Sequence, residues 1–105
     1  MSDQVNDIKS MISRVQKMVD SLPRIAGAGE DWTAFNASQH AHKQALNTVV
    51  GELRRMHGAR IHVTGSHSRI NLKGIKATST AGGAPLLRNW IAAARRHLEQ
   101  MEARP

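Results

Sequence analysis

The chain has 105 residues, enough for one domain (1–105) with a modest core, and it carries a net charge of +7. It contains no cysteine, which excludes a disulfide scaffold and a thiolate zinc site and fits a reducing compartment such as the cytoplasm. No apolar run reaches the about 18 residues of a membrane span, and the first residues lack the pattern of a secretory signal.

Residues 3–22 are predicted to form an amphipathic helix. Their apolar side chains are spaced alternately three and four residues apart, which is the pattern of a coiled-coil seam. So short a seam is not stable alone, so it packs either on the core of its own domain or against a second copy. The second alternative predicts a homo-oligomer that associates through Val5, Ile8, Ile12, Val15, Val19 and Leu22.

A connector at residues 24–36 leads into a second helix, predicted over residues 36–57. Trp32 and Phe35 lie in the connector, and we expect them to plug the end of the core rather than to form an exposed anchor. Gly51 lowers helix propensity, which suggests that the helix packs closely on another element there. Gly58 is the expected end of the helix.

Residues 60–78 form the strand-like part of the chain. Apolar and polar residues alternate on both sides of the turn sequence 65–68, and the alternation shifts by one residue at Gly74, which is typical of a β-bulge. We therefore predict a two-stranded antiparallel hairpin with a bend at Gly74. Its buried face holds Ile61, Val63, Ile70 and Leu72, and its exposed face holds His62, Thr64, Arg69, Asn71 and Lys73.

A last helix is predicted over residues 84–102, with Pro85 in its first turn. Its core-facing residues are Leu87, Ile91, Ala94, Leu98 and Met101, flanked by Leu86 and Trp90. The predicted fold class is therefore α+β, in the order helix, helix, β-hairpin, helix, with the hairpin packed on the second and third helices.

Every Asp or Glu is missing from the stretch between Leu53 and Leu98, so all its charged residues are Lys or Arg. So long a basic stretch favours contact with nucleic acid or an acidic protein surface over a merely solvated face. We expect no membrane and no small-molecule partner. The candidate nucleic-acid-binding residues are Arg60, Arg69, Lys73, Lys76, Arg88, Arg95 and Arg96.

The same stretch argues against catalysis and metal binding. Ser66, His67 and Ser68 lack a nearby carboxylate to orient a catalytic base. His40 and His42 are two residues apart and so lie on different faces of a helix, which makes them a poor ligand pair. His57, His62 and His67 are five residues apart and have no Cys or carboxylate beside them. We therefore expect neither an enzyme nor a bound metal or other cofactor.

The helix, basic hairpin and closing helix over residues 38–101 are similar to the small head-completion (head–tail joining) proteins of tailed phages, the lambda protein W family. The resemblance rests on the sequences at 58–63, 69–72 and 77–79. It implies assembly as a ring on the portal, in the virion or the host cytoplasm. More loosely, the chain resembles small basic accessory proteins of phages and mobile elements.

Three hypotheses about function follow. The first is a non-enzymatic protein that contacts nucleic acid through the basic hairpin and the last helix. The second is a structural connector or head-completion protein of a phage particle. The third is an inhibitor that binds an acidic surface of a host protein.

Overall fold

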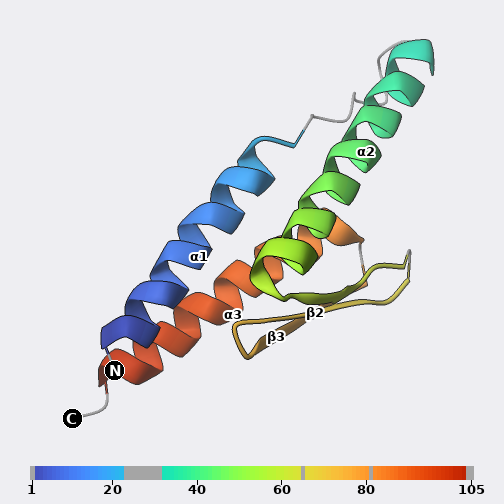
Figure 1. Cartoon of the computed structure of the whole chain (residues 1–105). Helices are drawn as coiled ribbons and strands as arrows, with labels where there is room; N and C mark the ends of the chain where they lie inside the picture. The colour runs from blue at the N-terminus through green and yellow to red at the C-terminus, as the bar shows by residue number, and fades with distance from the viewer. Residues whose placement is uncertain (1, 23–31, 65, 81, 104–105) are drawn as a thin grey trace.

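The computed structural model describes residues 2–22, 32–64, 66–80 and 82–103. The elements are α1 (Ser2–Asp20), α2 (Trp32–His57), β1 (Arg60–His62), β2 (Ser68–Leu72), β3 (Ile75–Ser79) and α3 (Gly83–Ala103). The α+β class and the predicted order of elements are confirmed, and the strand region holds three strands (Figure 1). Residues 24–31 of the predicted connector and Gly65 of the predicted turn lie outside the described residues.

The strands form one antiparallel sheet in the order β1-β2-β3. Leu72 pairs with Ile75 across a two-residue turn, Lys73–Gly74, in which both residues have positive φ (56° and 74°). This is the geometry of a type I′ hairpin turn, so the predicted bulge and the two-stranded hairpin are wrong. The residues that flank such a turn face the same side of the sheet, so the alternation shifts by one residue, as it does at a bulge.

The buried face of the sheet also differs from the prediction at one position. Ile61, Ile70 and Leu72 are buried as expected, but Val63 is 39% exposed. The reason is that β1 ends at His62, so the alternation of the strand no longer orients Val63. The loop that follows is closed by Ser68, whose hydroxyl donates to the carbonyl of Thr64 (2.9 Å) and accepts from its N–H (3.1 Å).

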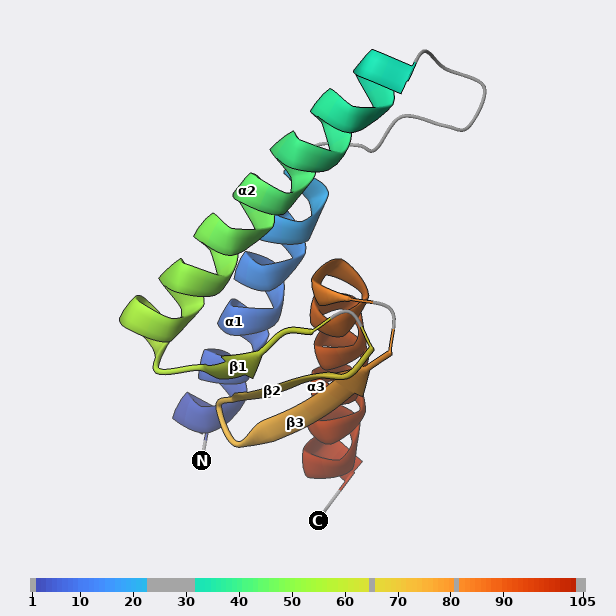
Figure 2. The same ribbon diagram turned by 90° about the vertical axis from the view of Figure 1, so that its right-hand side faces the viewer.

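The core lies between α3 and its two neighbours, the sheet on one side and α1 on the other. α3 crosses the inner face of β2 and β3, and α1 packs along α3, so the ends of the two helices near the termini lie together (Figures 1 and 2). Lys9 of α1 and Glu102 of α3 form a salt bridge of 3.1 Å. The apolar seam of α1 is covered within the chain, since Ile8, Ile12, Val15 and Val19 are buried and Val5 and Leu22 half-buried.

α2 contributes little to this core. Of its side chains, those of Val50 and Leu53 are fully buried, and its N-terminal half runs past the other elements (Figure 2). Trp32 is 71% exposed in the first turn and stacks on Phe35, with ring centroids 5.9 Å apart. The predicted aromatic plug is therefore wrong for Trp32, because the helix begins earlier than residue 36 and carries this residue away from the core.

Close packing of α2 occurs at a different place from the one predicted. A Cβ at Gly51 would meet no atom within 4 Å, so the expected close approach there is wrong. The close approach involves Gly83 at the start of α3, where a Cβ would lie 2.5 Å from Cδ2 of Leu46. The missing side chain of Gly83 therefore lets α3 begin against α2.

Candidate nucleic-acid interface

Alternate residues of the three strands point away from α3 and form what we call the outer sheet face. The strand register arranges them in two rows that cross the sheet. All are exposed except the half-buried asparagine. The rows are Arg60–Asn71–Lys76 and His62–Arg69–Thr78.

The register separates the charges of this face. Asn71 lies between Arg60 and Lys76 in one row, and Arg69 is flanked by neutral partners in the other. Like charges directly opposite each other would destabilise the sheet. The arrangement therefore keeps three cations on a rigid surface without placing any two as direct neighbours across strands.

The outer sheet face is hollowed and has no acidic neighbour in the sheet. The six side chains, with Ile61, Ile70 and Ala77, line a depression of about 470 Å³. The strands contain no Asp or Glu, and no salt bridge involves Arg60, Arg69 or Lys76 within the described part of the chain. Such a concave, uncompensated basic surface attracts anions.

A second depression continues the basic surface around the edge of β3. Its volume is about 350 Å³, and its lining includes Lys76 and Thr78 of β3 and Asn89 and Arg96 of α3. The side-chain amide of Asn89 donates to the carbonyl of Thr78 at 2.9 Å and so satisfies an acceptor at the open edge of the sheet. Because Arg96 lines the same depression as Lys76 and Thr78, it lies beside the outer sheet face.

Three of the residues predicted from the sequence lie elsewhere. Nζ of Lys73 is 3.0 Å from Oδ2 of Asp7, so this cation is paired with α1 and does not belong to the outer sheet face. Arg88 and Arg95 are exposed on α3, seven residues apart and therefore on one side of the helix. That side is turned about 100° from the one that holds Asn89 and Arg96.

Sequence reasoning assigned His62 and Asn71 to the exposed face but not to the site, and it missed Thr78. Thr78 lies opposite Arg69 only because β3 is a separate strand. Recognising Lys73–Gly74 as a two-residue turn would have revealed this pairing. Arg54, also in the basic stretch, donates to the carbonyl of Ile61 and so covers the free edge of β1.

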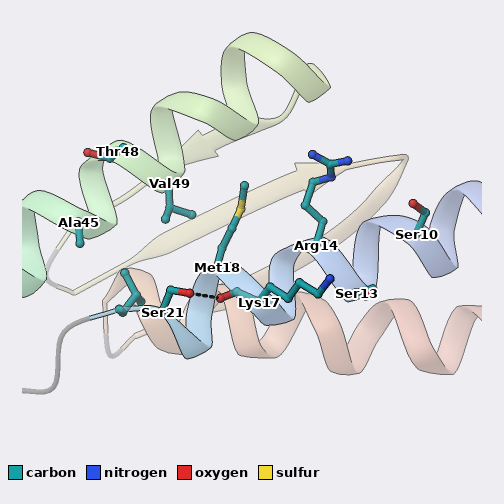
Figure 3. A pocket seen from close by; sticks show the side chains of 10 residues that line it. Ser10, Ser13, Arg14, Lys17, Met18, Ser21, Ala45, Thr48 and Val49 are labelled. Carbon is teal, nitrogen blue, oxygen red and sulfur yellow. Dashed lines mark hydrogen bonds between the residues drawn. The ribbon is translucent and has the colours of Figure 1, made fainter.

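A groove of about 760 Å³ lies between α1 and α2 (Figure 3). Met18 and Val49 point toward one another across it, and Arg14 and Lys17 line the α1 side. Its hydroxyls include Ser21, which donates to the carbonyl of Lys17 at 2.8 Å. Among the described residues, no histidine or carboxylate lines the groove.

Metal-binding and membrane-spanning features are absent from the described ranges. Across 2–22, 32–64, 66–80 and 82–103, no three His, Cys, Asp or Glu side chains are grouped so that they could hold a metal ion. None of the helices in these ranges is long and apolar enough to cross a membrane.

No family model matches the chain, and no curated protein or solved structure is similar enough to it to count as a match. The resemblance to phage head-completion proteins therefore stays a prediction from the sequence pattern.

Proposed function

We propose that this protein is a non-catalytic nucleic-acid-binding protein that contacts the phosphate backbone through its outer sheet face. The observation that carries the proposal is a set of three cations on one hollowed surface whose strands contain no carboxylate: Arg60, Arg69 and Lys76, none of which has a salt-bridge partner among the described residues. The side chains of Asn71, Thr78 and His62 beside them are hydrogen-bond donors as well, which suits phosphate oxygens. Arg96 extends the contact beyond β3.

Salt dependence of binding tests the proposal. Each phosphate neutralised by Lys or Arg releases counterions, so affinity falls steeply as salt rises from about 50 to about 200 mM. We expect fluorescence anisotropy to show binding of a labelled nucleic acid at low salt and a strong loss at the higher concentration. The triple variant R60Q/R69Q/K76Q is expected to lose at least about tenfold in affinity and to show a shallower salt slope.

The matched control removes the same number of charges from other surfaces. Arg14, Lys17 and Lys43 are exposed on α1 and α2, and the variant R14Q/K17Q/K43Q has the same net charge as the sheet variant. It is expected to lose less than about threefold, because long-range attraction between exposed charges is screened by salt. Equal losses in the two variants, or no binding of DNA or RNA at low salt, would refute the proposal.

The two other hypotheses have distinct signatures. Light scattering that finds a ring-sized oligomer of the isolated protein would favour a connector in a phage particle. A stoichiometric complex with an acidic host protein that survives nuclease treatment would favour an inhibitor. Both stay predictions from the sequence.

A further inference from the structure

The outer sheet face offers hydrogen-bond donors but no Trp, Tyr or Phe. The chain has three such residues, and Trp90 is buried on the opposite side of the sheet. Trp32 and Phe35 lie in the first turns of α2, a helix that reaches the sheet through its other end. Proteins that hold single strands stack successive bases on aromatic side chains. The one imidazole of this face, that of His62, lies at the end of a row and provides a platform for a single base, not for a run of bases.

The face is rigid, which favours a rigid ligand. The strands lie on α3, and the indole N–H of Trp90 donates to the carbonyls of both Leu72 and Ile75 at 3.2 Å, which fixes the hairpin of β2 and β3 to the helix. A flexible single strand would lose conformational entropy on such a surface, with only the His62 ring available for stacking to offset the loss. A duplex presents its phosphates already ordered.

The width of the sheet fits one groove of one duplex form. Arg60 and Lys76 stand in the same row on the two outer strands, about 9.6 Å apart, which is twice the usual spacing of neighbouring strands. The major groove of B-form DNA is about 12 Å wide, which exceeds this separation, and it admits a two-stranded β-ribbon. The major groove of an RNA duplex is too narrow and deep for side chains to read.

The central strand carries the residue types that recognise bases. Arg69 and Asn71 both project outward from β2. Asn71 lies between Arg60 and Lys76, and Arg69 lies between His62 and Thr78. Arginine forms paired hydrogen bonds with guanine in the major groove, and asparagine does so with adenine. The register thus places potential phosphate contacts on the outer strands and potential base contacts in the middle.

We propose that the ligand is double-stranded DNA and that the outer sheet face lies in its major groove. Arg60 and Lys76 contact phosphates on the two sides of the groove, and Arg69 and Asn71 face the base edges. This inference rests on the proposed function, because it specifies the nucleic acid bound by the same surface.

Three labelled ligands of one sequence test the inference: a DNA duplex of about 20 base pairs, or two helical turns, one of its strands, and the RNA duplex. Fluorescence anisotropy at about 50 mM salt is expected to show the DNA duplex bound at least about tenfold more tightly than the other two. If the single strand or the RNA duplex binds as tightly, the inference is overturned while the proposed function stands. Binding to none of the three overturns the proposed function itself.

Variants distinguish phosphate contacts from base contacts, and a competing ligand distinguishes the major groove from the minor groove. K76Q is expected to weaken every DNA duplex by a similar factor, whereas N71A is expected to change the ranking of duplexes that differ in sequence. W32A is the control and should leave duplex affinity unchanged. An equal effect of N71A on all sequences, a loss of more than about threefold with W32A, or displacement by the minor-groove ligand netropsin would each contradict major-groove contact by the sheet.

Discussion

Trp90 joins the helical layer to the sheet through both its ring and its N–H group. It is fully buried, and its indole N–H is shared between the carbonyls of Leu72 and Ile75, which flank the β2–β3 turn. Both Leu72 and Ile75 are themselves buried. A single side chain thus fills the core and satisfies two backbone acceptors.

Replacing this side chain by Phe tests that double role. W90F removes the N–H, leaves two buried acceptors without it and opens a small cavity, so we expect a loss of about 2–4 kcal/mol in the free energy of unfolding. Urea unfolding followed by circular dichroism measures the loss without depending on tryptophan fluorescence. W32F is the matched control, and because Trp32 is exposed its effect should stay within about 0.5 kcal/mol. Equal effects of the two variants would show that Trp90 does not hold the hairpin.

At the scale of elements, two glycines differ in how well glycine suits the element that contains it. Glycine is favoured at one position and disfavoured at the other. Gly74 has a φ of 74° in the β2–β3 turn, a conformation that other residues adopt at a cost of about 1–2 kcal/mol. Gly51 lies inside α2, where glycine is less favourable than alanine. A Cβ at either position would meet no atom within 4 Å, so steric contact does not enter the comparison.

The two alanine variants should therefore change stability in opposite directions. G74A is expected to lower the free energy of unfolding by about 1–2 kcal/mol, because alanine must adopt the positive φ of the turn. G51A is expected to raise it by about 0.5–1 kcal/mol, because alanine restricts the unfolded chain and favours the helix. Paired denaturant titrations measure both. A stabilising G74A would mean that residue 74 does not need a positive φ, which would contradict the type I′ turn.

The helices could be predicted from the sequence more fully than the sheet. The three- and four-residue spacing from Val5 to Leu22 and from Leu87 to Leu98 specifies which side of each helix is apolar, and both sides are buried. The third strand could not be predicted with the same rule, because a two-residue turn and a bulge shift the alternation equally. The exposure of Trp32 was missed because nothing local showed that α2 would begin at this residue and run past the core.

The candidate site was predictable in composition but not in geometry. The basic stretch without acids included Arg60, Arg69 and Lys76, and the structure brings these three together on the outer sheet face. The stretch could not show that Lys73 is paired with Asp7, because that contact joins parts of the chain far apart in sequence. The stretch also did not reveal that Arg96 lies beside β3 while Arg88 and Arg95 lie on another side of α3. That difference depends on how α3 is rotated against the sheet.

At the scale of the whole molecule, α1 and α3 form one apolar layer and α2 extends from it. The dimensions of 56 × 27 × 23 Å reflect this extension. From the sequence, the apolar seam of α1 could pack either within the chain or against a second copy. In the structure, the seam is covered by α3. A second copy could use the seam only by displacing α3, so the stability of the monomer and its capacity to associate through α1 are opposed.

A buried charge in the α1 layer tests this arrangement. V15D places a carboxylate at a fully buried position, and we expect a loss of at least about 3 kcal/mol in the free energy of unfolding. S13D adds the same charge at an exposed position of α1 and should stay within about 0.5 kcal/mol. Thermal unfolding and light scattering are measured on both. If V15D changed the oligomeric state and left the folded monomer equally stable, the seam would be an interface between copies.

The packing of α1 against α3 also determines when the protein can fold during its synthesis. α1 is synthesised before α3, yet the two helices cover each other. Until α3 appears, the apolar side of α1 has no partner within the chain, and the inner face of the sheet lacks Trp90. Folding is therefore delayed until the final helix is available, and the nascent chain carries an exposed apolar segment that chaperones can bind throughout that interval.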